Sequence, residues 1–465
     1  MYNNLIKIGV CDMKKKNAFT LIELLAVIVI LAIIAVIAVP IVLSIIDETK
    51  ENASLRSVDN YMHALELEIA NKGLNNQKYD DGVYSTEEFE IEIKGEKPTS
   101  GFIQIINGKV EKYSLIINNR QVDSKEEYDK WDGTLSEMIP DSEDNYHITK
   151  SSELAWLAKQ VNEGNTYEGV NFYLENNLDL NNIEWTPIGT QEHPFGGNLY
   201  GNNNVIKNMS INKISQNFLG IFGYIEVKEE EQLINNLIIK DSKIYGKAGI
   251  GSCVGVSKQN SNLDNITSFN NELYGVDFSV SGIIGQTSGN LKNLKTISNV
   301  IKTDTRQAGG IVGNASGKDE NNKAKIENCY VDSTTSIYSK GKIDAALGYN
   351  TSFTGGIVGT VRQYNISNVI SNATVIGEGS HVGGIAGQTR LINIENVSTG
   401  TNSYVEGTKL VGGIIGLLAE GANLNNAFSQ GIIVYIEDNS VGLIAGKIES
   451  GASANGDSDA ILKQK

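Results

Sequence analysis

The sequence predicts an α+β domain, built on a long hydrophobic helix and a small antiparallel sheet, followed by an all-β parallel solenoid. An uninterrupted apolar run of membrane-spanning length stands near the N-terminus, and short alternating strands follow it. Two motifs then recur through the second half of the chain, mostly every 28 to 30 residues. With 465 residues the chain is long enough for at least two domains, each with its own core.

The apolar run 19–46 contains no Lys, Arg or Asp, and Glu23 is its only ionisable residue. At about 1.5 Å per helical residue, this run exceeds the roughly 30 Å of a bilayer core. Lys14, Lys15 and Lys16 precede it, so we expect the N-terminus to stay cytoplasmic and the rest of the chain to face outward. Because a carboxylate inside a membrane is costly, Glu23 should have a cationic partner.

The stretch KKKNAFTLIE, which ends at Glu23, resembles the N-terminus of type IV prepilins, in which a peptidase cuts ahead of the Phe and methylates the new amine. The resemblance implies cleavage between Ala18 and Phe19, with Ala18 replacing the more usual glycine. Residues 1–18 would then be the prepilin leader, and Glu23 would neutralise the new N-terminal amine during filament assembly. A plain signal-anchor helix is the alternative interpretation.

Pro40 matches the helix-kinking proline of the same family. Met13 would give the usual short leader, so the true start is either Met1 or Met13. The resemblance also implies two kinds of partner, namely prepilin peptidase and other pilins that bind through the helix 19–46. It places the chain in the inner or cytoplasmic membrane before assembly and in an extracellular pilus afterwards. We expect the cell surface to be that of a Gram-positive bacterium.

Helical periodicity continues beyond the membrane-length run, and Gly73 is the expected end of the helix. The apolar residues at three- and four-residue spacings are Leu55, Val58, Met62, Leu65 and Ile69. Strands are predicted at 89–93, 102–106 and 110–117. Asn107 and Gly108 supply the positive φ angles of a tight hairpin. The resemblance to type IV pilins implies the pilin fold for residues 19–122, and the acidic segment 123–145 is predicted to form a linker.

Two repeated motifs define the remainder of the chain. The first is a glycine-flanked apolar box, with clear copies at 220–223, 282–285, 310–313, 356–359, 384–387 and 413–416 and degenerate ones at 249–255 and 442–446. The second is apolar-x-Asn-apolar, centred on Asn208, Asn236, Asn265, Asn293, Asn328, Asn368, Asn396 and Asn426. Two signatures that keep one period predict a repeat architecture.

Each repeat holds short β-branched runs between Gly, Asn and Ser turns, so one repeat per coil of a parallel β-solenoid is expected. Eight or nine coils, stacked about 4.8 Å apart, would make a rod of roughly 40 Å. Stacked at one turn, the side-chain amides of the repeated Asn residues can hydrogen-bond to their equivalents in neighbouring coils. The glycines let the backbone pack closely at a bend. We therefore interpret both motifs as structural.

The same geometry separates Cys253 from Cys329 by about three coils, or roughly 14 Å, which is too far for a disulfide. Buried free thiols are expected. The segment 151–164 shows one apolar helical face, with Ser151 as a candidate N-cap and Gly164 as a C-terminal stop, and it should cap the rod.

The glycine boxes resemble the GLUG repeat of bacterial surface proteins, and residues 167–202 are similar to the region that precedes such repeats. The resemblance implies a right-handed parallel β-helix over about 146–455, which leaves residues 456–465 as a tail.

No catalytic pattern stands out. The histidines His63, His147, His193 and His381 are scattered over different predicted elements, and Cys-x-x-Cys or His-Glu-x-x-His spacings are absent, so neither a metal nor another cofactor is expected. Acidic residues of the repeats, such as Asp304, Asp319, Glu320 and Asp332, are interpreted as solvated loop charges. Carboxylates that meet across adjacent coils, as in β-helical polysaccharide-degrading enzymes, remain an open alternative.

The interval from Asn328 to Gly356 is the longest between an Asn motif and a glycine box, so residues 332–354 are predicted to protrude. Loops on a rigid scaffold commonly carry recognition, and Tyr338 and Tyr349 could stack on a glycan or peptide. An idle insertion is the equally weighted alternative.

The net charge of −16 argues against nucleic-acid binding. We expect a minor or tip type IV pilin whose β-helix is an adhesin module for a glycan or protein on a host cell or other surface. The alternatives are a pilus- or membrane-tethered polysaccharide-degrading enzyme and a pseudopilin of a secretion or uptake system.

Overall fold

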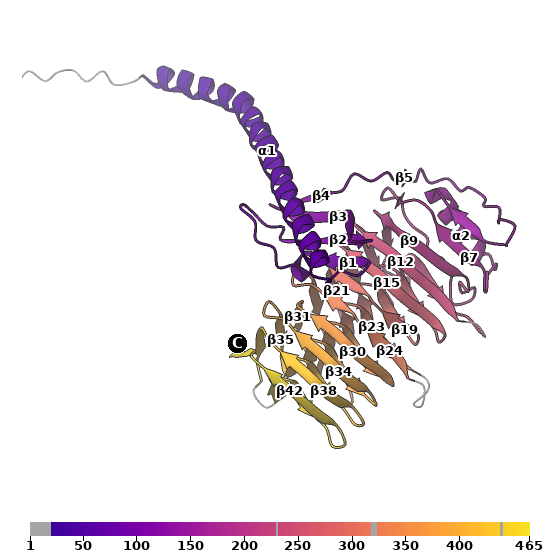
Figure 1. Ribbon diagram of the computed structural model, residues 1–465. Helices are drawn as coiled ribbons and strands as arrows, with labels where there is room; N and C mark the ends of the chain where they lie inside the picture. Colours follow the sequence, from indigo (N-terminus) through magenta and orange to yellow (C-terminus); the bar gives the residue numbers. More distant parts are fainter. Residues whose placement is uncertain (1–19, 229–230, 318–322, 438–439) are drawn as a thin grey trace, which may run out of the picture. The chain divides into compact units, whose positions relative to one another are not determined.

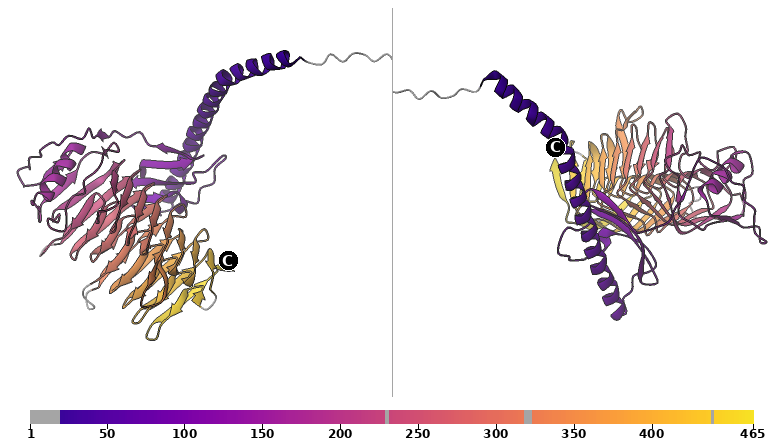
Figure 2. Two further views of the ribbon diagram at one scale, coloured as in Figure 1. Left: turned by 180° about the vertical axis from the view of Figure 1, so that it is seen from behind. Right: turned by 90° about the horizontal axis from the view of Figure 1, so that it is seen from above.

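In the computed structural model of this chain, the described residues are 20–228, 231–317, 323–437 and 440–465. They fall into two compact units, of which the first ends at Ser57 and the second is Val58–Lys465. The first unit holds the N-terminal part of a long helix. The second holds the end of that helix, a small antiparallel sheet and a large parallel solenoid (Figures 1 and 2). The predicted fold class is confirmed.

Helix α1 (Leu21–Leu74) continues through Pro40 without a break. Ile46 is the least exposed of the large apolar side chains between Leu21 and that position, and it is still 42 % exposed. This is the one helix of the described residues that is long and apolar enough to cross a membrane. It ends one residue after the predicted stop at Gly73.

The small sheet has the order β1-β2-β3-β4 and is antiparallel throughout. Its strands are β1 (Gly82–Ser85), β2 (Ser100–Ile106), β3 (Lys109–Ile117) and β4 (Arg120–Asp123). The β2–β3 hairpin turns at Asn107 and Gly108, whose φ angles are 52° and 71°, as predicted. Apolar residues of the C-terminal part of α1, such as Val58 and Leu65, pack with Ile103 and Leu115 of the sheet.

The strand predicted at 89–93 is wrong. Phe89 and Ile91 are buried in the core of the small sheet, which explains their alternating pattern, but the segment is irregular. It follows a 3-10 helix, η1 (Thr86–Glu88). Because β2 already pairs with β1 on one side and β3 on the other, it has no free edge for this segment.

The solenoid is built from four sheets of stacked strands. The nine-stranded sheet contains β10 (Ser210–Lys213), β13 (Lys243–Gly246), β16 (Glu272–Gly275), β21 (Val300–Thr303), β26 (Ser336–Ser339), β31 (Thr374–Gly377), β35 (Tyr404–Gly407), β39 (Ile432–Tyr435) and β43 (Ile461–Gln464). The eight-stranded sheet contains β11 (Phe222–Ile225), β14 (Val254–Ser257), β18 (Ile284–Thr287), β23 (Val312–Ser316), β29 (Val358–Arg362), β33 (Ala386–Arg390), β37 (Ile415–Leu418) and β41 (Ala445–Ile448). Successive strands in both sheets are parallel.

The main path of the fifteen-stranded sheet runs through β6 (Tyr146–Ile148), β7 (Asn171–Leu174), β9 (Asn198–Lys207), β12 (Gln232–Lys240), β15 (Ser261–Phe269), β19 (Asn290–Lys292), β24 (Ala324–Glu327), β30 (Tyr364–Ser371), β34 (Asn393–Thr399), β38 (Asn423–Ser429) and β42 (Ser453–Ser458). Beside this path lie β5 (Asp129–Lys130), β8 (Leu178–Asp179), β20 (Lys295–Ile297) and β25 (Tyr330–Val331). The seven-stranded sheet contains β17 (Val280–Ser281), β22 (Ala308–Gly309), β28 (Tyr349–Gly355), β32 (Ser380–Gly383), β36 (Lys409–Gly412) and β40 (Val441–Gly442), with β27 (Lys342–Asp344) antiparallel to β28.

The solenoid has about 11 turns, because the main path of its largest sheet passes through 11 strands. The expected eight or nine coils fall short of this number. The coils of β6 and β7 precede Asn208, the first residue of the repeated Asn motif, and so carry no signature that the repeat analysis could count.

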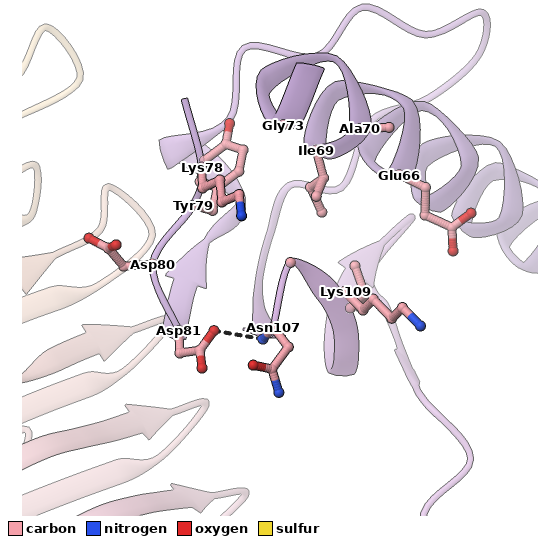
Figure 3. Close-up of a pocket in the computed structure, with 12 residues that line it drawn as sticks. Glu66, Ile69, Ala70, Gly73, Lys78, Tyr79, Asp80, Asp81, Asn107 and Lys109 are labelled. Carbon is pink, nitrogen blue, oxygen red and sulfur yellow. Dashed lines mark hydrogen bonds between the residues drawn. The ribbon is translucent and has the colours of Figure 1, made fainter. Parts of the chain in front are cut away.

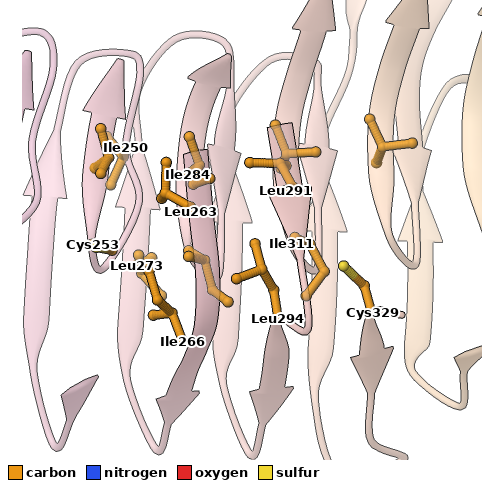
Figure 4. Close-up of a cluster of buried hydrophobic side chains, with 14 of the residues drawn as sticks. Ile250, Cys253, Leu263, Ile266, Leu273, Ile284, Leu291, Leu294, Ile311 and Cys329 are labelled. Atoms are coloured by element: carbon orange, nitrogen blue, oxygen red, sulfur yellow. The ribbon is translucent and has the colours of Figure 1, made fainter. Parts of the chain in front are cut away.

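The interior of the solenoid is one continuous apolar core. Figure 4 shows Leu263, Leu291 and Leu294 pointing into it from adjacent coils. Cys253 and Cys329 lie in this core as buried free thiols, as predicted, and burial raises the pKa of both.

The first glycines of the boxes stack directly on one another. A Cβ atom at Gly310 would lie 2.2 Å from the carbonyl oxygen of Gly356, and one at Gly356 would lie 2.0 Å from that of Gly384. The series continues, since a Cβ at Gly384 would lie 2.2 Å from the oxygen of Gly413. Successive coils therefore approach at this corner to a distance that only glycine permits.

Helix α2 (Ser151–Asn162) covers one end of the core with Leu154, Leu157 and Val161. The predicted N-cap is displaced by one residue, from Ser151 to Lys150. The carboxylate of Glu153 accepts hydrogen bonds from the backbone N–H groups of Thr149 (2.7 Å) and Lys150 (2.9 Å), which is the return half of a capping box.

Residues 123–145, predicted to form a linker, instead pack against the solenoid. Strand β5 pairs with β8, and Trp131 and Met138 are buried in the solenoid core. Residues 456–465, predicted as a tail, include the end of β42 and all of β43, which pair with the preceding coil. The apolar residues of these two segments are not regularly spaced, so hydrophobic periodicity could not predict that either segment packs on the solenoid.

We predict that Gly356→Ala destabilises the second unit by at least about 2 kcal/mol, because its Cβ would collide with backbone of the next coil. Gly82→Ala is the matched control, since a Cβ at Gly82 meets nothing within 4 Å. Denaturant unfolding of both variants measures the difference. Equal midpoints for the two variants would contradict the proposed close approach.

Candidate functional site

The start of α1 carries the segment that the sequence singles out for assembly. Ala18 and Phe19 lie outside the described residues. The Glu23 carboxylate accepts hydrogen bonds from the backbone N–H (2.9 Å) and the hydroxyl (2.8 Å) of Thr20. The Thr20 hydroxyl in turn accepts from the backbone N–H of Glu23 at 3.3 Å. The pair forms a capping box, so Glu23 has a partner within its own chain.

Sequence reasoning missed this role of Thr20, although Thr-x-x-Glu before an apolar run is a recognisable signal of a helix start. From Leu24 to Ile46, the helix that follows is apolar on all sides, and its large apolar side chains are exposed. Such a surface is stable only when lipid or other apolar helices cover it. Pro40 lies within this exposed stretch, where neighbouring helices can compensate for its missing N–H.

All eight repeated Asn residues adopt the left-handed conformation, with φ between 50° and 57°. Asn tolerates this conformation better than most other residues that carry a side chain. The left-handed backbone is therefore a second reason for Asn at these positions, which the repeat spacing alone did not predict. The amide nitrogens of Asn328, Asn368, Asn396 and Asn426 each donate to the amide oxygen one coil earlier, over 2.6 to 3.3 Å. The structure thus brings these residues together as a ladder.

The ladder is not continuous through its first coils. Asn265 donates to Asn236 at 2.8 Å, but Asn293 donates to Asp264 at 2.7 Å, and Asn208 donates to Asp179 at 2.8 Å. A carboxylate replaces an amide as the acceptor in the last two bonds.

The structure separates the two tyrosines of the predicted protruding segment. Tyr338 lies on β26, inside the nine-stranded sheet, and its hydroxyl donates to the carboxylate of Glu378. Tyr349 begins β28, stacks at 6.3 Å on His381 and lies 4.7 Å from the ammonium of Lys409. The prediction that all of 332–354 protrudes is therefore wrong.

The extra length of this repeat is accommodated by a short antiparallel hairpin. Strand β27 pairs back on β28, with Ile343 opposite Asn350. Ile343 is 74 % exposed. The long interval between Asn328 and Gly356 indicated an insertion. It did not indicate which of the inserted residues form strands that pair within the sheets.

Ser380 and His381 resemble a nucleophile and base, since the hydroxyl lies 2.7 Å from Nδ1 of the ring. Both residues are only 1 % exposed, and the ring packs against Tyr349 and Phe353. Burial lowers the pKa of His381 to about 4, so the ring is neutral near pH 7. A substrate could not reach this pair.

Among the described residues, no group of three or more His, Cys, Asp or Glu side chains is arranged to hold a metal ion. His147 contacts two carboxylates, of Glu175 at 2.6 Å and Asp141 at 3.1 Å, which raise its pKa. All three side chains are more than a third exposed, which is typical of a surface ion-pair cluster.

A cavity of about 870 Å³ lies between the end of α1 and the β2–β3 hairpin. Figure 3 shows Asp81 accepting a hydrogen bond from the backbone N–H of Asn107, at 2.6 Å. Glu66 and Lys109 lie on its opposite side, so carboxylates and ammonium groups alternate around it. This mixture favours no single class of ion.

The small sheet packs on the solenoid within the second unit, and we call this contact the junction. Its apolar part joins Val83 and Phe102 of the sheet to Val205, Ile238 and Phe269 of the solenoid. The rings of Phe102 and Phe269 meet edge to face at 5.3 Å.

Asp332 lies at the junction and is fully buried, so its interpretation as a solvated loop charge is wrong. Its carboxylate accepts hydrogen bonds from Ser100 of β2 (3.1 Å), from the backbone N–H of Ser298 (3.0 Å) and from Thr335 (2.7 Å). Desolvation raises its pKa despite these bonds. Asp304 is exposed, as expected, whereas Asp319 and Glu320 lie outside the described residues.

Ion pairs also cross the junction. The buried ammonium of Lys240 lies 2.5 Å from the carboxylate of Asp123, and that of Lys295 lies 2.8 Å from both carboxylate oxygens of Glu88. Desolvation would raise the pKa of Asp123, but Lys240 and hydrogen bonds from Ser114 and Gln121 hold it below its ordinary value. The small sheet and the solenoid are therefore joined by apolar, hydrogen-bonded and ionic contacts together.

Comparison with known families identifies one motif. Residues 13–39 match the prokaryotic N-terminal methylation motif. No curated protein and no solved structure matches the chain. The chain thus combines a type IV pilin-like N-terminus with a β-helix domain.

We predict that Lys240→Met destabilises the second unit by about 2 kcal/mol at neutral pH, because the carboxylate of Asp123 loses its cation. The partial exposure of Asp123 keeps this figure below that of a fully buried pair. The variant Lys240→Met/Asp123→Asn should recover most of the loss. Denaturant unfolding measures each variant.

The pH dependence follows from the lowered pKa of Asp123. Stabilisation by this pair is present above the unfolded-state pKa of 3.8 and is lost as the pH falls through the lower folded-state value. The difference in the free energy of unfolding between the native chain and Lys240→Met should therefore become smaller below about pH 4. A difference that widened on acidification would show that the pair is not the source.

Proposed function

We propose that this chain is a low-abundance type IV pilus subunit that displays its β-solenoid as an adhesin-like module for a surface ligand. The observation that carries the proposal is the pairing of an exposed apolar helical segment of membrane-spanning length, in the first half of α1, with a large β-solenoid in one chain. The methylation motif at 13–39 supports processing by prepilin peptidase and packing of the helix among other pilins.

The junction supports a display role for the solenoid. Because Lys240, Lys295 and Asp332 join the solenoid to the small sheet, a force on the solenoid reaches α1 through the folded sheet. A flexible linker would instead let the module reorient freely. An adhesin under tension gains from the rigid connection.

The size of the solenoid favours low abundance. Eleven strands stacked about 4.8 Å apart in its largest sheet extend roughly 50 Å along the stacking direction. Such a module on every subunit would crowd a densely packed filament. We therefore place the chain at the tip or at rare positions, rather than throughout the shaft.

We propose binding and not catalysis as the role of the solenoid. The Ser380–His381 pair is inaccessible, and no group of three or more His, Cys, Asp or Glu side chains among the described residues is arranged to hold a metal ion. No observation favours the polysaccharide-degrading alternative over a binding module.

We predict that the exported protein begins at Phe19 with a methylated amine, which N-terminal mass spectrometry can establish. Glu23→Ala should leave the chain in the membrane fraction but lower its recovery in sheared pili at least about tenfold, because the new amine loses its counter-charge. Thr20→Ala is a control that removes the hydroxyl partner of Glu23 and keeps the carboxylate. An N-terminus elsewhere, or equal recovery of Glu23→Ala, would contradict assembly by this route.

We predict that a strain lacking this chain still makes pili but loses attachment to the surface that its parent colonises. Immunogold labelling of sheared pili should give sparse or terminal label. Uniform label along every pilus would contradict the placement, and label confined to membranes would favour a pseudopilin. Undiminished attachment by the deletion strain would contradict the adhesin role.

A further inference from the structure

We propose that the outer face of the fifteen-stranded sheet binds an uncharged glycan in a groove across β9, β12, β15, β19 and β24, a site that rests on the proposed adhesin function. These strands lie side by side in Figure 1. The groove has a volume of about 650 Å³, which is in the range of small-ligand sites. We call it the amide groove. Its outward-facing lining includes Asn198, Tyr200, Leu233, Asn262, Asp264, Asn290, Lys292, Lys325 and Glu327.

Side-chain amides are the main polar groups along one column of the groove. Asn262 and Asn290 are opposite each other on neighbouring strands, and Asn290 donates to the amide oxygen of Asn262 at 2.9 Å. The oxygen of Asn290 accepts from the backbone N–H of Lys325 at 3.1 Å.

Each primary amide offers two N–H donors and two acceptor lone pairs. The contacts within the column use only part of this capacity. The remaining donors and acceptors face solvent on an outward column, where they match the adjacent hydroxyl groups of a sugar ring.

A stack of aromatic rings leads into the amide groove along the next outward column. His147 stacks on Tyr173 at 5.4 Å, and Tyr173 stacks on Tyr200 at 4.9 Å with 14° between the ring planes. The residue opposite Tyr200 on the following strand is Asn235, which is smaller. Tyr200 is partly exposed and lines the groove, where its ring can pack against the C–H groups of a sugar.

The charges of the amide groove favour an uncharged ligand. Among the described residues that line it, three carboxylates, of Glu231, Asp264 and Glu327, are balanced by three ammonium groups, of Lys292, Lys323 and Lys325. The whole chain carries −16, so this balance is local. A polyanion would meet as many repulsive as attractive groups, and so would a polycation.

A peptide fits the amide groove less well than a glycan. The groove lies over the middle of a sheet, whose backbone groups pair with neighbouring strands, so a peptide cannot add as a further strand. Leu263 and Leu291 point inward and are at most 1 % exposed, which leaves Leu233 as the outward apolar side chain of its lining. Apolar anchor pockets for side chains are thus missing from the described lining.

The test uses the full chain in detergent and calorimetric titration with four neutral hexasaccharides, of glucose, galactose, mannose and N-acetylglucosamine. Polygalacturonate and an acidic, a basic and an apolar decapeptide are the comparison ligands. At least one neutral hexasaccharide should bind. Tyr200→Ala and Asn262→Ala should each weaken that binding at least about tenfold, and Tyr200→Phe, which keeps the ring, by no more than about threefold.

Tyr245→Ala is the matched control, because Tyr245 is a partly exposed tyrosine on β13 of another sheet. The Tyr245→Ala variant should bind the hexasaccharide with the affinity of the native chain. If Tyr200→Ala and Tyr245→Ala bound the hexasaccharide with equal affinity, the proposed location of the glycan site would be overturned. Binding of only polygalacturonate or a peptide, or of none of the neutral sugars, would overturn the ligand class.

Cell attachment separates this inference from the proposed function. If the deletion strain loses attachment and complementation with Tyr200→Ala/Asn262→Ala restores it fully, the adhesin role stands and the amide groove is not its site. If deletion leaves attachment intact while the groove variants lose glycan binding, the groove stands as a sugar site and the adhesin role falls.

Discussion

The close approach of successive coils at the stacked glycines is the constraint on which the solenoid depends. Gly310, Gly356 and Gly384 leave only 2.0 to 2.2 Å between an imagined Cβ and the next carbonyl oxygen. That corner fixes the register of the sheets on either side of it, since a coil cannot shift without a collision. The apolar core and the Asn ladder then follow, because both require equivalent residues to lie directly above one another.

The junction extends this order to the small sheet. Lys240 and Asp332 are buried charged residues, and a buried charge is tolerated only when it has close partners. Their partners are on different elements, with Asp123 and Ser100 from the small sheet. The polar contacts therefore specify one arrangement of sheet and solenoid, where the apolar contact of Phe102 and Phe269 alone would permit sliding. Within the second unit, these contacts hold the small sheet and the solenoid in one defined arrangement.

The sequence predicted the elements that are periodic and missed those that depend on long-range contacts. The glycine boxes and Asn motifs predicted coil stacking because their period is the coil itself. The burial of Asp332 could not be predicted, since its partner Ser100 is 232 residues away and no local pattern links them. Tyr338 was misplaced for a related reason: an interval reveals an insertion, but strand pairing decides which residues of it protrude.

The repeat also explains where function can arise on its surface. Inward positions and turn positions are constrained by the coils above and below, so the repeated Asn and glycine residues, such as Asn396 and Gly384, have the same role in most coils. Outward positions carry no such constraint, and they vary along the column that passes through Tyr173, Tyr200 and Asp264. Stacked tyrosines at outward positions gain little from the core. Their position beside a polar groove is the arrangement on which the proposed glycan site rests.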